Sequence, residues 1–147
     1  MRKNRKKLLG TMVISFTLCL TMLDMPGTAL AERCVDNSDG TVTDNSAGLM
    51  WQKATAGPMN WDQAMSYASG LSLGGHSDWR LPSRYELEDL YDSPCKNMMD
   101  VREDYYWSST TSDYVTDFVW RITFVDGYGD YRRNSYNYYI RTVRDAQ

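Results

Sequence analysis

The chain has 147 residues, 42% of them hydrophobic and 24% charged, so its composition is that of a globular protein rather than a disordered chain. It contains one histidine and three cysteines, which excludes a multi-histidine metal centre and a four-cysteine zinc site within one chain. The length provides for about one domain besides an export signal. Aromatic residues reach 13%, with 11 tyrosines and five tryptophans, and they are the unusual feature of the composition.

The first 31 residues have the pattern of a signal peptide. Residues 2–7 are basic, residues 8–23 form an apolar run, and residues 29–31 (Ala-Leu-Ala) supply the small residues at which a signal peptidase cleaves. We therefore expect residues 1–31 to be removed and residues 32–147 to form an exported domain, periplasmic or extracellular. An uncleaved membrane anchor is the alternative, but the run is short for a bilayer span. After cleavage we expect no membrane insertion.

Removal of this segment would change the charge of the protein. Residues 1–31 carry five basic residues and one acid, so the net charge would move from −3 to −7. Binding to nucleic acid depends on a surplus of cationic contacts, so we expect no nucleic-acid partner.

Two cysteines, Cys34 and Cys95, lie beyond the predicted signal. An even number of cysteines in an exported protein favours a disulfide, and two free thiols are the alternative.

The first part of the predicted domain contains two similar polar turns. Residues 36–40 and 44–48 both begin with Asp and end with Gly, and they alternate with the short apolar or β-branched runs 41–43 and 49–51. This pattern predicts short strands joined by turns, that is, an N-terminal β-hairpin. A calcium loop is the alternative, because three aspartates are close together, but their spacing departs from the EF-hand pattern. We therefore expect no metal.

Two helices are predicted next. Asn60 with Gln63 has the form of a capping box, and apolar residues at helical spacing predict an amphipathic helix over residues 61–72, ended by Gly74 and Gly75. A second capping box, Ser83 with Glu86, begins a shorter helix that continues to Pro94. The proposed apolar face of the first helix is formed by Trp61, Ala64, Met65, Ala68 and Leu71.

The last third of the chain changes to a period of two. Phe118, Trp120, Ile122 and Phe124 alternate with other residues, which predicts a strand with one mainly apolar face, and Asp126-Gly127 follows as a turn signal. The other predicted strands are residues 105–111, 128–133 and 138–143. The fold class is therefore α+β: a β-hairpin, two helices and a twisted antiparallel sheet.

Four segments in this order resemble a known family: residues 35–52, residues 77–83 (Ser-Asp-Trp-Arg-Leu-Pro-Ser), residues 106–110 (Tyr-Trp-Ser-Ser-Thr) and residues 139–144 (Tyr-Ile-Arg-Thr-Val-Arg). The chain resembles the Lcl C-terminal domain family, a bacterial family of unknown function that includes the C-terminal domain of the Legionella collagen-like adhesin. The resemblance spans about residues 33–144.

This resemblance implies a C-type-lectin-like fold, with two helices beside a twisted antiparallel sheet and the chain termini close together. It also implies a surface protein that binds rather than catalyses, with glycan or glycosaminoglycan adhesion as the activity associated with the collagen-like member. Family members often carry one cysteine after a helix tyrosine and another in the last strand; the corresponding residues here are Ala68 and Thr142. A Cys34–Cys95 disulfide would then be a substitute elsewhere.

The sequence offers little for catalysis. His76, beside Ser77 and Asp78, is the one histidine, but adjacent side chains along a chain do not form a catalytic relay with a distant serine unless the fold brings them together. Glu86, Glu88 and Asp89 could suggest a glycosidase pair, but nearby arginines favour a salt-bridged surface instead. We expect no enzyme, no catalytic residue and no cofactor.

The segment 128–139 has a composition typical of recognition surfaces, since tyrosine offers a large stiff contact face and asparagine adds adaptable hydrogen bonds. Arg132 and Arg133 could together hold a carboxylate or a sulfate. The alternative is that these tyrosines close the sheet. The predicted ligand-binding residues are Tyr128, Tyr131, Arg132, Arg133, Asn134, Tyr136, Asn137 and Tyr138.

The sequence therefore predicts an exported, non-enzymatic adhesion domain that recognises a glycan or a cell-surface protein. The alternative function is a small structural or assembly subunit of the bacterial envelope with protein contacts alone. The oligomeric state is left open.

Overall fold

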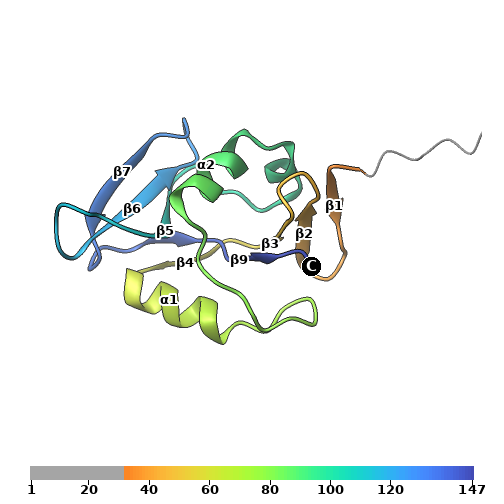
Figure 1. Ribbon diagram of the computed structural model, residues 1–147, viewed down its shortest axis with the longest axis horizontal. Helices are drawn as coiled ribbons and strands as arrows, with labels where there is room; N and C mark the ends of the chain where they lie inside the picture. The colour runs from red at the N-terminus through yellow and green to blue at the C-terminus, as the bar shows by residue number, and fades with distance from the viewer. Residues whose placement is uncertain (1–31) are drawn as a thin grey trace, which may run out of the picture. The chain divides into compact units, whose positions relative to one another are not determined.

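The computed structural model describes residues 32–147, which form two helices and two sheets (Figure 1). The predicted signal peptide lies outside the described residues. The first sheet has the order β1 (Cys34–Asp36), β2 (Thr41–Asp44), β3 (Leu49–Gln52), β9 (Val143–Asp145). The second has the order β4 (Ala56–Met59), β8 (Tyr138–Ile140), β5 (Tyr105–Thr111), β6 (Phe118–Thr123), β7 (Gly129–Arg133). The helices are α1 (Trp61–Gly70) and α2 (Arg84–Asp92), and the 3₁₀ turn η1 (Pro94–Met98) follows α2.

The α+β class and the N-terminal hairpin are confirmed. Strands β2 and β3 pair antiparallel around the polar turn, with Asp44 opposite Leu49, and β1 pairs with the other edge of β2. Gly48 has a φ of +66° at the end of this turn, a conformation that glycine adopts without strain. Within residues 32–147, neither helix has the length and hydrophobicity needed to cross a membrane.

The predicted closing strand, residues 138–143, is wrong as a single element. The structure divides it into β8, in the second sheet, and β9, in the first, so the chain crosses between sheets at Arg141 and Thr142. The prediction of a wholly antiparallel sheet is also wrong, because β5 and β8 are parallel. The sequence pattern of residues 138–143 correctly predicted extended backbone. Nothing in that pattern indicated that the chain leaves one sheet and enters the other at Arg141.

Strand β4 was not predicted. Its Gly57-Pro58 pair is atypical of strand interiors, since proline lacks an N–H and glycine has no side chain to pack. The strand is short, lies at the edge of the second sheet and pairs irregularly with β8. Edge position and irregular pairing are the conditions under which such a sequence is tolerated.

Both capping boxes are confirmed. The Gln63 amide donates to the Asn60 side chain at 3.0 Å, and the Glu86 amide donates to the Ser83 hydroxyl at 3.2 Å; each reciprocal bond is also present. Helix α1 ends at Gly70, before the predicted residue 72, because Leu71 is extended. Met65, expected on the apolar face, is 40% exposed, so the buried stripe of α1 is narrower than predicted.

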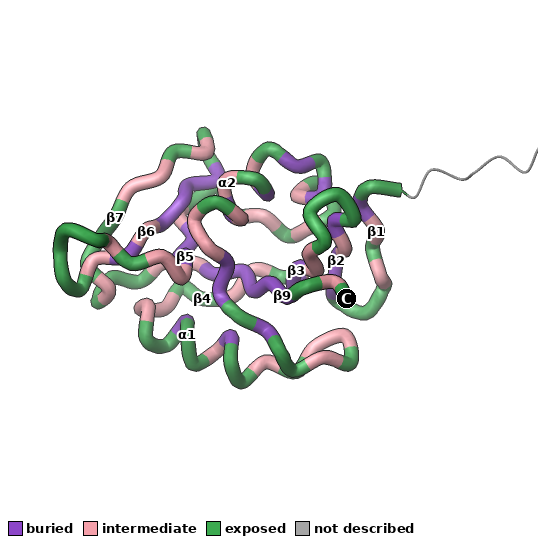
Figure 2. The backbone as a smooth tube through the Cα atoms, in the orientation of Figure 1, coloured by how far each residue is buried: buried purple, intermediate pink, exposed green. Residues whose placement is uncertain are grey.

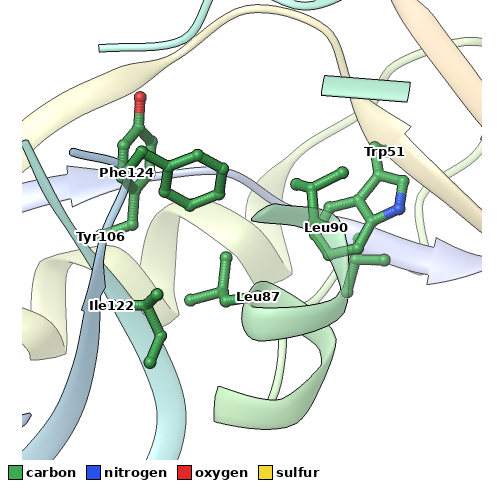
Figure 3. Close-up of a cluster of buried hydrophobic side chains, with 7 residues drawn as sticks. Trp51, Leu87, Leu90, Tyr106, Ile122 and Phe124 are labelled. Atoms are coloured by element: carbon green, nitrogen blue, oxygen red, sulfur yellow. The ribbon is translucent and has the colours of Figure 1, made fainter. Parts of the chain in front are cut away.

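The two helices cover opposite faces of the central strands (Figure 1). Leu87 and Leu90 of α2 pack in one core cluster with Tyr106, Ile122 and Phe124, as Figure 3 shows. The cluster beneath α1 combines Ala64 and Ala68 with Leu81, Trp107, Val119 and Ile140. Neighbouring residues of β5 point to opposite faces and therefore enter different clusters. Figure 2 shows that burial is concentrated on these strands, whereas β7 and the loop after β5 are exposed.

Cys34 and Cys95 form a disulfide that attaches β1 to η1. The expected pairing is therefore present in the structure. The two residues are 61 positions apart, and closing a loop of that length stabilises a fold by about 4 kcal/mol on the chain-entropy description.

Hydrogen bonds link α1 to the last part of the chain, where the family resemblance places a cystine. The Gln52 side chain donates to the Tyr67 hydroxyl at 2.8 Å and accepts from the Thr142 hydroxyl at 3.1 Å. Ala68 is buried beside this link. A chain of three polar side chains thus joins the same two regions without a covalent bond.

Candidate functional site

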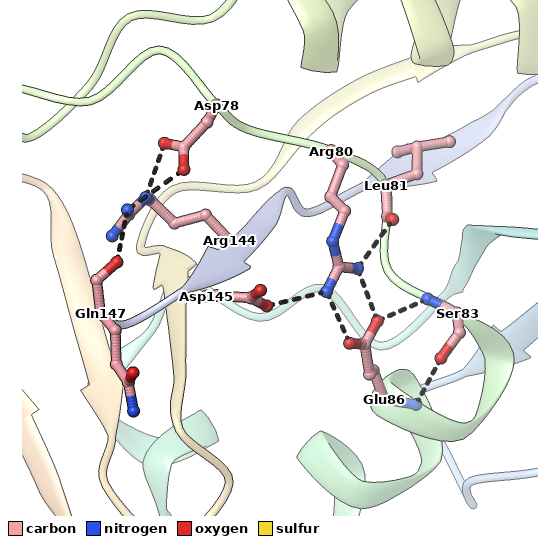
Figure 4. Close-up of polar contacts among 8 residues, drawn as sticks. All are labelled: Asp78, Arg80, Leu81, Ser83, Glu86, Arg144, Asp145 and Gln147. Atoms are coloured by element: carbon pink, nitrogen blue, oxygen red, sulfur yellow. Dashed lines mark hydrogen bonds and ion pairs between the residues drawn. The ribbon is translucent and has the colours of Figure 1, made fainter.

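Arginines and acids that lie in the family motifs, or within three residues of them, hold neighbouring segments together in the described structure. We call these residues the motif network: Asp78, Arg80, Glu86, Arg141, Arg144 and Asp145. Figure 4 shows its outer part. Arg144 pairs through two nitrogens with Asp78, and Arg80 does the same with Glu86. The distances are 2.7 and 3.1 Å in the first pair and 2.8 Å for both bonds in the second. These bonds fix the linker 77–83 between α2 and β9.

Arg141 forms the buried part of the motif network. Its side chain is inaccessible to solvent and donates to the carbonyls of Gln52, Lys53 and Asp100 and to the hydroxyl of Thr55. Burial lowers the pKa of this guanidinium, while the nearby Tyr106 and Asp100 act in the opposite direction. Arg141 therefore joins β3, the loop after it, and the segment before β5, which is a structural role.

Of the carboxylates considered for catalysis, Glu86 is held by hydrogen bonds within the protein. Burial raises the pKa of Glu86, but hydrogen bonds from Arg80 and from the Ser83 amide outweigh it and hold the pKa below its ordinary value. A glycosidase acid needs the opposite, a raised pKa. Glu86 is therefore a capping and ion-pairing residue.

His76 does not meet a nucleophile in the described structure. Its backbone pairs with Leu73 in an isolated bridge, and no hydrogen bond joins its imidazole to Ser108 or Ser109. Both serine hydroxyls instead donate to backbone carbonyls, those of Trp120 and Pro82. This geometry offers no catalytic relay.

The three N-terminal aspartates considered for calcium hold their own turns. Asp39 accepts from the Thr41 amide and hydroxyl, and Asp36 accepts from the Ser38 amide and from Lys53. Asp44 accepts from Ser46 in its own turn and from Ser93, which directly precedes η1. The described residues contain no grouping of three or more potential metal-ligating side chains of the His, Cys, Asp or Glu type.

The predicted ligand-binding residues divide between two faces of the second sheet. Register pairs Tyr131 with Trp120 and Arg133 with Phe118, whereas Arg132 pairs with Val119. Because successive strand residues point to opposite faces, Tyr131 and Arg133 share one face and Arg132 lies on the other. The two neighbouring arginines do not converge on one anion. Tyr128 lies in the exposed turn before β7.

On the face that carries Arg132, the charged side chains pair with one another or stack on tyrosines. Arg121 lies 3.5 Å from the ring centre of Tyr105 and 4.3 Å from that of Tyr138, and it forms an ion pair with Asp130 at 2.7 Å. Arg132 pairs with the same aspartate at 3.0 Å. The remaining predicted residues are placed nearby: Tyr136 stacks on Tyr138, Asn137 is exposed, and the backbone of Asn134 bonds Asp117 and Trp61. The charges on this face have partners within the protein.

The opposite face contains a groove of about 570 Å³. It lies between the first turn of α2, the end of β5, the loop 112–117 and strands β6 and β7. We call it the aromatic groove, lined by Arg84, Tyr85, Thr110, Thr111, Ser112, Asp113, Tyr114, Trp120 and Tyr131. Its volume lies within the range of small-molecule sites.

Tyrosines form the rim of the aromatic groove. Tyr114 is 91% exposed, Tyr85 is 63% exposed and Tyr131 is 37% exposed, and Tyr131 packs edge-on against Trp120 at 5.5 Å between ring centres. The helix start that carries Tyr85 is attached to β5, because the Arg84 backbone amide donates to the Thr110 hydroxyl at 3.0 Å and the Ser109 amide donates to the Pro82 carbonyl at 2.7 Å. These bonds join the start of α2 to β5.

Most of the groove residues were missed at the level of sequence. Tyr131 alone belongs to the predicted set; Tyr85 and Tyr114 come from segments that showed no resemblance to a binding motif. One signal was present: Tyr85 is an aromatic residue on the polar side of a predicted amphipathic helix. Nothing in the sequence indicated that the start of α2 and strand β7 line one groove.

These features define a small, disulfide-linked α+β domain with an aromatic groove on one face of its second sheet. The sequence model described as the Lcl C-terminal domain matches residues 40–144, so the chain belongs to the Lcl C-terminal domain family, as the motifs predicted. The matched range contains the groove and every member of the motif network except Asp145, and it does not include Cys34. No curated protein matches the sequence at a significant level.

Proposed function

We propose that this protein is an exported recognition domain that binds saccharides at a bacterial surface without catalysing a reaction, and that the aromatic groove is its binding site. The observation that carries the proposal is the ring of three exposed tyrosines around one groove. Exposed aromatic residues that are gathered on one surface often mark an interaction site, and tyrosine is enriched where ligands are recognised.

Three further features support this function. The family includes the C-terminal domain of an adhesin, the disulfide suits an oxidising compartment, and the groove combines aromatic faces with hydroxyl and charged groups. The two-helix α+β architecture also supports kinship with C-type-lectin-like domains. Fold kinship alone does not define a ligand, so the site carries the argument.

The test compares neighbouring residues on the two faces of β7. Protein purified from cells expressing the full chain is applied to a glycan array, and affinities for the glycans that bind are measured by calorimetry. We expect Tyr131→Ala to weaken binding about tenfold, since it removes an aromatic contact face that packs on Trp120. Arg132→Ala, one residue away on the opposite face, serves as the matched control and should bind as the parent protein does.

Two results would contradict the proposal. Loss of binding in Arg132→Ala with full binding in Tyr131→Ala would place the site on the opposite face. A stable envelope complex or homo-oligomer with no affinity for any saccharide would instead support the alternative function, a structural or assembly subunit.

A further inference from the structure

The charges around the aromatic groove are balanced. Among its lining residues in the described structure, Arg84 and Asp113 are the two that carry a full charge at neutral pH. Glu88 lies beside Arg84 and Arg133 lies beyond Tyr131, which adds one charge of each sign. The groove therefore has no surplus of cations.

Arg84 is held in one orientation but is not saturated with hydrogen bonds. Its guanidinium carbon lies 4.0 Å from the ring centre of Trp120 and 4.7 Å from that of Tyr85. Its Nε atom is buried and lies 3.6 Å from a Glu88 oxygen, too far for a good hydrogen bond. Within residues 32–147 no hydrogen bond uses the two terminal nitrogens of Arg84. Stacking thus fixes the plane of the guanidinium while leaving its outer N–H groups available to a ligand.

Asp113 supplies the complementary group. It is exposed, it lies in the loop 112–117, and within the described residues its carboxylate has no hydrogen bond or ion pair. The loop itself is ordered by Ser112, whose hydroxyl accepts from the amides of Tyr114 and Val115 at 3.3 Å. An ionised carboxylate is an acceptor alone, so it suits a ligand that donates.

An acidic ligand fits this arrangement poorly. A carboxylate or sulfate in the groove would approach Arg84 but would also meet Asp113 and Glu88, and residues 32–147 carry a net charge of −7. Like charges on partners suppress association. A sugar hydroxyl, by contrast, both donates and accepts, so neighbouring hydroxyls satisfy Asp113 and Arg84 together.

We propose that the ligand of the aromatic groove is a neutral saccharide, with hydroxyls that donate to Asp113 and accept from Arg84 while a sugar face packs on the tyrosines. This inference rests on the proposed saccharide-binding function. It assigns specificity to the charged pair and contact area to the aromatic rim.

The experiment uses two matched glycan panels, one of neutral hexose oligosaccharides and one of the same backbones bearing carboxylate or sulfate groups. Protein purified from cells expressing the full chain is titrated with each panel by calorimetry at low and high salt. We expect the neutral panel to bind with an affinity that salt changes less than twofold, because no net charge is neutralised. Asp113→Ala should weaken this binding about tenfold, since it removes a charge-assisted hydrogen bond.

Glu103→Ala is the matched control for Asp113→Ala. It removes the same charge from another exposed position outside the groove and should leave binding unchanged. Preference for the acidic panel, with affinity that rises in Asp113→Ala and falls steeply with salt, would overturn the neutral-ligand inference and leave the proposed function standing. Full neutral binding in Asp113→Ala would overturn the assigned role of Asp113. Absence of binding to both panels would overturn the proposed function itself.

Discussion

The motif network and the aromatic groove use arginine in opposite ways. Arg141 and Arg144 direct their outer nitrogens at acceptors of the protein, and Arg80 binds both oxygens of Glu86. Arg84 is fixed by stacking on Trp120 and leaves its outer nitrogens unused within the described structure. The buried Nε of both Arg84 and Arg141 lacks a hydrogen bond, so the contrast lies in the outer nitrogens. A guanidinium whose outer nitrogens bond to the protein specifies a fold, whereas one that is oriented with its outer nitrogens unused is suited to bind a ligand.

The residues that identify the chain as a family member also differ from the residues of the proposed binding site. The motifs that carry the family resemblance include Asp78, Arg80, Arg141 and Arg144, and all four hold the chain together. Tyr85, Asp113 and Tyr114 lie outside those motifs and surround the groove. Family membership therefore predicts the scaffold of this protein, whereas the site that we propose for its ligand is formed mainly by residues between the motifs.

The strongest test of this comparison is Arg141→Met. The substitution keeps an apolar stem but leaves the carbonyls of Gln52, Lys53 and Asp100 without their buried donor. Each unsatisfied buried acceptor costs about 1–3 kcal/mol, so we expect the free energy of unfolding to fall by about 4 kcal/mol, measured by urea denaturation. Saccharide affinity of the folded fraction should stay at the parent value. A loss below about 1 kcal/mol would show that the motif network is not what stabilises the fold.

The pH dependence of stability is a second test, with a smaller expected effect, and it concerns Glu86 of the motif network and Asp44 outside it. The pKa of Glu86 is lowered because hydrogen bonds from Arg80 and Ser83 outweigh the raising effect of burial; the pKa of Asp44 is lowered because bonds from Ser46, Ser93 and Arg33 outweigh burial. A lowered pKa in the folded protein means that the unfolded chain binds the proton more readily. The stabilisation is therefore complete above the ordinary values of 4.5 and 3.8 and is lost as pH falls through them and below.

We expect the free energy of unfolding to be nearly flat from pH 7 to about 5 and to fall at lower pH. In Glu86→Gln the neutral-pH stability should drop and the acid-dependent loss should become smaller, as measured by urea midpoints across this range. Glu103→Gln, which removes an exposed carboxylate without a partner in the described structure, is the control and should keep the parent profile. An unchanged profile in Glu86→Gln would separate Glu86 from the stability of the network.

The sequence was sufficient for the local elements because each has a local cause. Asn60 and Ser83 begin the helices through side-chain bonds three residues away, and Asp44 to Gly48 forms its turn in the same way. The cysteine pairing could be inferred because residues 32–147 contain two cysteines and therefore allow one pairing. These features need few or no contacts between distant segments.

The groove could not be predicted because its parts meet only through tertiary packing. Tyr85 and Tyr131 are brought to one groove by the docking of α2 on β5 and β6, and Trp120 lies between Arg84 and Tyr131. The error in joining Arg132 with Arg133 has a simpler cause: adjacency in sequence was taken for adjacency in space, although a strand sends neighbours to opposite faces. The division of residues 138–143 also depends on tertiary pairing, because β8 pairs with β4 and β5 whereas β9 pairs with β3.

The smallest stability effect and the sharpest test of the groove come from two exposed tyrosines. Tyr114 is at the rim of the groove, whereas Tyr128 was predicted as a ligand residue but lies in the turn outside the groove lining. We expect Tyr114→Ala and Tyr128→Ala each to change the free energy of unfolding by less than about 0.5 kcal/mol, because both rings are largely exposed. Tyr114→Ala should weaken saccharide binding about fivefold in calorimetry, the effect of losing one aromatic contact, and Tyr128→Ala should bind fully. Weaker binding in Tyr128→Ala with full binding in Tyr114→Ala would instead place the binding site in the segment 128–139, which composition alone suggested. The comparison is direct because the two variants remove the same side chain and differ only in its position in the fold.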